Sequence, residues 1–147
     1  MRLLLILLLL SSFSCWAQDT LPELNQKIIH YCEEKKGKKV GRGECWDLAA
    51  QILDQENAKW DHQFVFGTKI NPDNSAVLPG DIIQFKGVKT STGISASQHT
   101  AIVYKINPDG KFIIAEQNAN GKRKVMFNEF DRTTITKGKI FIYRPVR

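Results

Sequence analysis

Apolar residues recur at helical spacing in two segments of the first half of the chain. In the first segment, Thr20 and Glu23 form the Thr-x-x-Glu pattern of a capping box, with Pro22 in the first turn, where its missing N–H is harmless. Lysines and then Gly37 follow, as is typical of a helix C-terminus. The pattern predicts a helix ending before Gly37, with an apolar stripe of Leu21, Leu24, Ile28, Tyr31 and Cys32.

The second segment begins within Gly41–Ala50, GRGECWDLAA. Its apolar positions follow the i, i+3, i+4, i+7, i+8 pattern of one helix face: Cys45, Leu48, Ala49, Ile52 and Leu53. We therefore expect a helix whose first turn carries Cys45, directed toward the core, directly after a loop with two glycines. Residues 57–78 show no regular pattern and are predicted to be irregular.

After Pro79-Gly80 the pattern changes to short strands. Asn107–Gly110 has the composition of a tight turn between two of them, and Val88–Ser97 is expected to be a polar loop. Helices followed by an antiparallel meander indicate the α+β class. The predicted strands are Asp81–Phe85, His99–Ile106, Lys111–Asn118, Lys122–Phe127 and Lys139–Arg144.

The N-terminal segment has the pattern of a secretory signal peptide. Arg2 precedes an apolar run, Leu3–Leu10, that is too short to span a bilayer, and small Ala17 suits cleavage. We expect residues 1–17 to be removed and residues 18–147 to form one domain outside the cytoplasm, secreted or periplasmic. A lipoprotein anchored at Cys15 is the alternative, although bulky Phe13 disfavours it. No later apolar run reaches membrane length, so no integral membrane segment is expected.

The charge of the chain is positive. The formal net charge is +6, and removal of Arg2 with the leader leaves 20 Lys and Arg against 15 Asp and Glu, or +5. This excess favours an anionic partner such as cell wall, and equally fits ordinary solubility. No nucleic-acid-binding motif is present, so no nucleic-acid partner is expected.

A candidate catalytic group emerges when the hairpin around Asn107–Gly110 is paired. If Ile106 and Lys111 flank the turn, His99 faces Asn118 across the two strands. Because side chains alternate along a strand, Glu116 lies on the same face, one diagonal step from His99. A slip of one residue would separate these groups.

Cys45 fits this group as a nucleophile. Free N–H groups and the positive partial charge at a helix N-terminus stabilise a thiolate, and a nearby imidazolium lowers the thiol pKa further. Glu116 or Asn118 would orient His99, and the Cys45 N–H would stabilise an oxyanion. With Cys15 in the leader, Cys32 and Cys45 remain, and a Cys32–Cys45 disulfide is the competing interpretation.

These residues resemble a known family, the CHAP domains of the papain-like NlpC/P60 cysteine amidases and peptidases. The resemblance covers residues 41–144, and its separate motifs occur in the order and spacing of that family. The matching segments are Gly43–Ala49 (GECWDLA), Leu78–Phe85 (LPGDIIQF), Gln98–Val103 (QHTAIV), Ile113–Asn118 (IIAEQN) and Phe141–Arg144 (FIYR).

The resemblance implies a papain-like fold with Cys45 as nucleophile, His99 as general base and acid, Glu116 as orienting acid and Asn118 as accompanying amide. It implies hydrolysis of peptidoglycan, as an N-acetylmuramoyl-L-alanine amidase or D,L-endopeptidase. Two features depart from the family: no wall-binding repeat is present, and the segment before Cys45 is basic, without the acidic calcium loop of some members.

Other functions stay open at this point. The substrate could be a small amide or a non-wall peptide, or the domain could be a non-catalytic binding or toxin-like module. No cofactor or metal is expected, because the histidines His30, His62 and His99 lie far apart and no Cys/His pair has ligand spacing.

Overall fold

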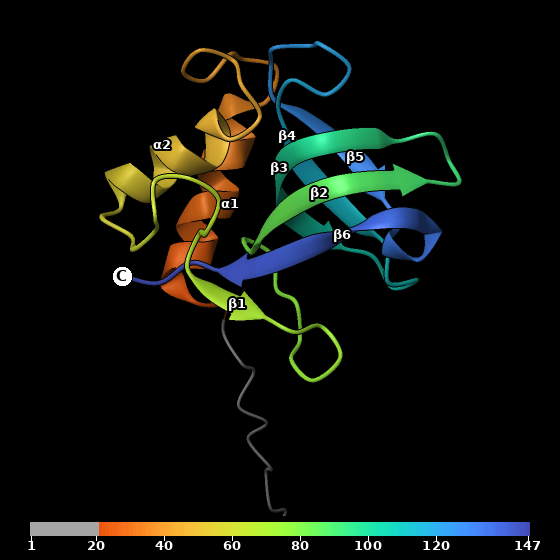
Figure 1. The fold of residues 1–147 in the computed structure, drawn as a ribbon. Helices are drawn as coiled ribbons and strands as arrows, with labels where there is room; N and C mark the ends of the chain where they lie inside the picture. The colour runs from red at the N-terminus through yellow and green to blue at the C-terminus, as the bar shows by residue number, and fades with distance from the viewer. Residues whose placement is uncertain (1–20) are drawn as a thin grey trace, which may run out of the picture.

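The computed structural model describes residues 21–147. The predicted signal peptide, residues 1–17, and the capping residue Thr20 lie outside this range. Two helices and six strands follow in chain order, together with a short 3-10 helix at Arg132–Thr134. The α+β class predicted from the sequence is confirmed, and the helices gather on one side of a single sheet (Figure 1).

Helix α1 spans Glu23–Lys35 and buries the predicted stripe of Leu24, Ile28, Tyr31 and Cys32. It begins later than predicted. Pro22 is the N-cap residue, with φ −50° and ψ 139°, and is not in the first turn. A residue before proline avoids helical conformations, so a helix beginning at Leu21 is disfavoured. The chain leaves α1 through Gly37, whose φ is +76°.

Helix α2 spans Asp47–Gln55 and packs Leu48, Ala49, Ile52 and Leu53 into the core, as predicted. Cys45 lies just before the helix and not within its first turn. The Asp47 N–H donates to the Glu44 carbonyl at 3.2 Å, so a tight turn around Cys45 leads directly into α2. The thiol therefore stays close to the helix N-terminus.

All strand pairs of the sheet are antiparallel, in the order β1-β6-β2-β3-β4-β5. The predicted meander is correct for β2–β5 only, because β6 returns along the outer side of β2 and then pairs with β1. The predicted polar loop Val88–Ser97 is mostly strand, with a tight turn in the middle. The bounds are Thr68–Ile70 (β1), Ile82–Thr90 (β2), Ser95–Ile106 (β3), Phe112–Glu116 (β4), Met126–Phe130 (β5) and Ile135–Arg144 (β6).

Two apolar clusters occupy the two faces of the sheet. The first joins α1 and α2 to Ile82, Ile102 and Ala115. The second lies on the opposite face, where the rings of Phe85 in β2 and Phe130 in β5 meet edge to face with centroids 5.0 Å apart. Since β3 and β4 separate these strands, the sheet must curl around the second cluster. No helix in residues 21–147 is long and apolar enough to cross a membrane.

Candidate active site

The hairpin of β3 and β4 brings His99 to Glu116. Near the turn the register is shifted by one residue from the predicted pairing, since Ile106 pairs with Phe112. A bulge between Val103 and Lys105 restores the predicted register, so that Ala101 pairs with Glu116. His99 and Glu116 then lie diagonally on one face, and His99 Nε2 lies 2.6 Å from Glu116 Oε2.

Cys45 completes a chain of three groups. Burial of the thiol raises the Cys45 pKa, but the neighbouring His99 ring and the backbone N–H groups of Thr100 and Trp46 outweigh burial and lower it. Because Glu116 holds Nε2, Nδ1 is the ring nitrogen left for the sulfur.

The histidine is correspondingly basic. Burial alone would lower the His99 pKa, but the hydrogen bonds to Cys45 and Glu116, reinforced by their charges, raise it to about 9. The His99 side chain is only 15% exposed and that of Glu116 only 11%, so water screens this interaction little. Both shifts favour the thiolate–imidazolium form of the pair.

Asn128 is a member of this site that the sequence did not reveal. Its Nδ2 donates to Glu116 Oε1 at 2.7 Å, so both carboxylate oxygens of Glu116 have partners. Asn128 lies on β5, opposite Ile114 of β4. The signal that could have found it is the register of β4 with β5, because residues on one face of adjacent strands meet.

Asn118 does not pair with His99, as the predicted register required, because β4 ends at Glu116. Asn118 has a φ of +63° and begins the Asn118–Lys122 turn, where its N–H donates to the Lys122 carbonyl at 3.0 Å. Its side-chain Nδ2 donates to Glu44 Oε2 at 3.1 Å. Asn118 therefore contacts the loop that carries Cys45 and not the imidazole.

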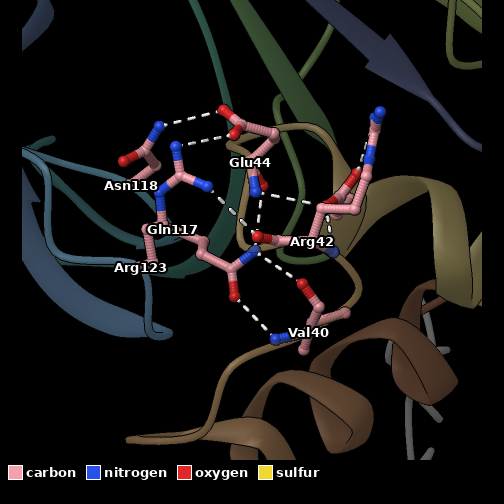
Figure 2. A network of polar contacts seen from close by, with 7 residues as sticks. Val40, Arg42, Glu44, Gln117, Asn118 and Arg123 are labelled. Carbon is pink, nitrogen blue, oxygen red and sulfur yellow. Dashed lines mark hydrogen bonds and ion pairs between the residues drawn. The ribbon is translucent and has the colours of Figure 1, made fainter.

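Gln117 joins that loop to the end of β4 (Figure 2). This side chain is fully buried. Its Nε2 donates to the carbonyls of Val40 at 3.0 Å and Glu44 at 2.9 Å, and its Oε1 accepts from the Val40 N–H at 2.8 Å. Because Gln117 follows Glu116 and Glu44 precedes Cys45, one amide links the two halves of the site.

A second side chain fixes the same loop from the helix side. The Oδ2 atom of Asp47 accepts from the N–H groups of Arg42 at 2.7 Å and Glu44 at 3.1 Å. Gly41 has a φ of +55°, and a Cβ there would lie 2.9 Å from Asp47 Oδ2, so this close approach needs glycine. The glycine-containing loop before Cys45 is thus held by Asp47 and Gln117.

A pocket of about 640 Å³ opens beside the imidazole. His99 and Glu116 line it together with Asn118, Lys122 and Asn128, and apolar side chains such as Phe85 and Phe130 are also part of its wall. Cys45 is not among the lining residues, so the pocket extends from the histidine side of the site.

Cys32 has a different environment. It is completely buried in α1, and burial raises its pKa well above the ordinary range. Both Cys32 and Cys45 are free thiols, so the alternative Cys32–Cys45 disulfide is not formed. Within residues 21–147 no group of three His, Cys, Asp or Glu side chains is placed to hold a metal ion.

A cysteine at the N-terminus of a helix, paired with a histidine and a carboxylate on an antiparallel sheet, defines the class of cysteine proteinase-like folds. The chain belongs to the AIM3/BBC1 cysteine proteinase-fold domain family, whose family model matches residues 17–147. The CHAP domains are a family that the motifs of the chain resemble.

The chain is also similar to one curated protein and to two solved structures. The chain is 29% identical over 144 residues to Altered inheritance of mitochondria protein 3 of Debaryomyces hansenii, a match that covers 81% of this chain and 15% of that protein. The chain thus spans only a small part of its relative. The crystal structure of Ly7917 superposes with a TM-score of 0.57 at 18% identity, covering 81% of this chain and 61% of that one. A second Ly7917 structure, with the hydrolyzing product of MDP, gives a TM-score of 0.58.

Proposed function

We propose that the protein is a cysteine hydrolase that cleaves amide bonds of peptidoglycan, outside the cytoplasm, with Cys45, His99 and Glu116 as its catalytic residues. The observation that carries this proposal is the 2.6 Å contact between His99 Nε2 and Glu116 Oε2, in a site where His99 lowers the pKa of Cys45. Asn118 and Asn128 are assigned positioning roles, on the Cys45 loop and on Glu116 respectively.

The geometry supports a two-step acyl transfer. The Cys45 thiolate attacks the carbonyl carbon of the amide, and the negative charge moves to the carbonyl oxygen, where the Cys45 N–H donates to it. The imidazolium of His99 gives its proton to the amide nitrogen, the C–N bond breaks, and a thioester remains on Cys45. Neutral His99 then removes a proton from water as it attacks the thioester carbon. The C–S bond breaks, and the acid product leaves with the Cys45 thiolate and the His99 imidazolium restored.

Peptidoglycan is favoured as substrate by the CHAP-like motifs around Cys45, His99 and Glu116, by the net positive charge of the chain and by the leader-like N-terminal segment. The likeness to Ly7917, one structure of which contains the hydrolyzing product of MDP, is consistent with a hydrolase. The amidase and the endopeptidase reactions differ in the bond that is cut.

A second candidate substrate is a peptide outside the wall. It is favoured by the relative from Debaryomyces hansenii, whose name refers to mitochondria and not to a cell wall. The same three catalytic residues would act on both substrates, so only the reaction products distinguish the two candidates.

The experiment is a digestion of purified peptidoglycan by the mature protein, with the soluble fragments identified by mass. Release of free stem peptides from glycan would support the amidase, and stem peptides cut internally would support the endopeptidase. Cys45→Ala protein is the control for contaminating hydrolases. Intact peptidoglycan, together with cleavage of unrelated peptides by the same preparation, would favour the second candidate.

A further inference from the structure

A row of cations borders the nucleophile loop. Residues 36–38 at the end of α1 lie beside the segment before β5, since the Gly37 N–H donates to the Val125 carbonyl and the Val125 N–H to the Lys38 carbonyl, both at 2.9 Å. In Figure 1 the loops that contain these segments lie at the same end of the molecule. We call the resulting group the basic rim: Lys35, Lys36, Lys38, Lys39, Arg42, Lys122, Arg123 and Lys124.

The basic rim reaches the catalytic groups from both sides. A Cβ on Gly43 would lie 2.8 Å from Arg123 Cβ and 3.2 Å from Lys39 Cε, so both side chains flank a residue two positions before Cys45. At the other end, Lys122 lines the pocket that contains His99 and Glu116. A ligand lying on the rim would therefore meet the site.

Most of this charge is unbalanced. Arg42 pairs with Asp47 at 3.6 Å and Arg123 with Glu44 at 3.1 Å. The nearby carboxylates of α1 are engaged elsewhere, Glu33 with Tyr104 and Glu34 with His30. Within the part of the chain that the structure describes, six rim lysines form no ion pair: Lys35, Lys36, Lys38, Lys39, Lys122 and Lys124. Such a group attracts an anionic partner.

We propose that the basic rim binds the carboxylates of an acidic peptide, and that the amide cleaved at Cys45 belongs to such a peptide. This inference rests on the proposed function, because it names the substrate class of the same site. Lysines on flexible stems bind charges spaced along a chain without requiring one fixed geometry. The rim thereby holds the peptide while its amide carbon faces the thiolate.

Other anionic ligands fit the rim less well. Single-stranded nucleic acids need aromatic faces for base stacking, but the rings beside the rim are already covered by its cations: Lys35 lies over Tyr31, Lys36 over Phe127 and Arg42 over Trp46. Firm attachment to a membrane surface adds exposed apolar anchors to the cations. The exposed large apolar side chains of residues 21–147 are Phe64, Val65 and Ile94, and none belongs to the rim.

The test measures binding without turnover. Cys45→Ala protein is titrated into a fluorescein-labelled peptide of alternating Glu and Gly, and into its Gln and Gly counterpart, by fluorescence anisotropy at low salt. We expect the Glu peptide to bind at least about tenfold more tightly, and this difference to shrink as salt is added. The Lys38→Glu/Lys39→Glu/Lys124→Glu variant should lose about tenfold or more in affinity.

A matched control separates position from net charge. Lys59→Glu/Lys105→Glu/Lys137→Glu changes the charge equally at exposed lysines outside the rim and should keep the affinity for the Glu peptide. Equal loss in both triple variants would overturn the proposal, as would tighter binding of an oligothymidylate or of phosphatidylglycerol vesicles than of the Glu peptide. Unchanged melting temperatures verify folding.

Failure of the rim and failure of the proposed function give different results. In one outcome, the wild-type protein hydrolyses peptidoglycan while the Cys45→Ala form shows no preference for the Glu peptide. That result overturns the proposed binding by the rim and leaves the proposed function standing. Binding that follows the rim, in a protein whose wild type hydrolyses neither peptidoglycan nor peptides, overturns the proposed function.

Discussion

His99 Nε2 and Glu116 Oε2 lie 2.6 Å apart, on neighbouring strands and 17 residues apart in sequence. This contact fixes the ring orientation and leaves Nδ1 for Cys45, so the carboxylate acts on the nucleophile through the imidazole. The second oxygen of Glu116 is held by Asn128 at 2.7 Å, which prevents the carboxylate from rotating away.

Glu116→Gln should lower kcat by about 100-fold or more with little change in KM, because the charge that stabilises the His99 imidazolium is lost and no substrate contact is removed. Asn118→Ala should have a smaller effect, since Asn118 contacts Glu44 and not His99. Steady-state kinetics on the identified substrate check both. Equally small losses for the two variants would contradict the role of Glu116.

The pH profile should have two limbs. The Cys45 pKa is lowered below its ordinary value, so the rate should rise with pH at a lower pH than for an ordinary thiol. The His99 pKa is raised to about 9, so the rate should fall as pH rises through about 9 and the imidazolium loses the proton that the leaving amine needs. A rate that keeps rising through pH 9 would indicate an ordinary thiol. The profile of kcat/KM measures this directly.

Gln117→Ala should lower both stability and activity, because it leaves the Val40 N–H and two carbonyls without their partner in a buried site. We expect a loss of about 3 kcal/mol in the free energy of unfolding. Gln117→Glu is the matched variant: it keeps the shape of the side chain and the acceptor for the Val40 N–H, but when ionised it cannot donate to the two carbonyls. Because both variants disturb the loop before Cys45, both should slow the alkylation of Cys45. Denaturant unfolding and iodoacetamide rates test this, and wild-type rates in both variants would contradict it.

Chelators should leave the activity unchanged. The proposed chemistry uses a thiolate, an imidazole and a carboxylate, and none of these steps needs a Lewis acid. Activity should therefore survive EDTA and be abolished by iodoacetamide. Loss of activity in EDTA that added zinc or calcium restores would contradict the metal-free mechanism.

Much of the fold and site could be predicted because local patterns determined it. The stripe ending in Cys32 and the face beginning at Cys45 gave two helices, and the alternation along the hairpin gave the diagonal pair of His99 and Glu116. The pairing next to the turn is shifted by one residue from the predicted register, and the bulge near Tyr104 shifts it back. Neither deviation was foreseen, and together they leave His99 and Glu116 in the predicted diagonal position.

The missed features depend on long-range pairing, which a local pattern does not contain. Nothing within β6 specifies that it returns to β2, and short β1 forms only because β6 offers it an edge. Asn128 requires the β4–β5 register, and Gln117 requires knowledge that the loop before Cys45 crosses the end of β4. Asn118 was placed opposite His99 because the strand was expected to continue past Glu116.

The measurement that tests the central claim most directly is the release of new amino groups from purified peptidoglycan by wild-type, Cys45→Ala and Cys32→Ala proteins. Cys45 is half-buried at the site, whereas Cys32 is enclosed in the core. Each variant therefore removes one thiol group, but from a different environment. We predict that wild-type and Cys32→Ala proteins release amino groups at similar rates, that Cys32→Ala protein melts at a lower temperature, and that Cys45→Ala protein releases none. No release by folded wild-type protein, or undiminished release by Cys45→Ala protein, would contradict the account.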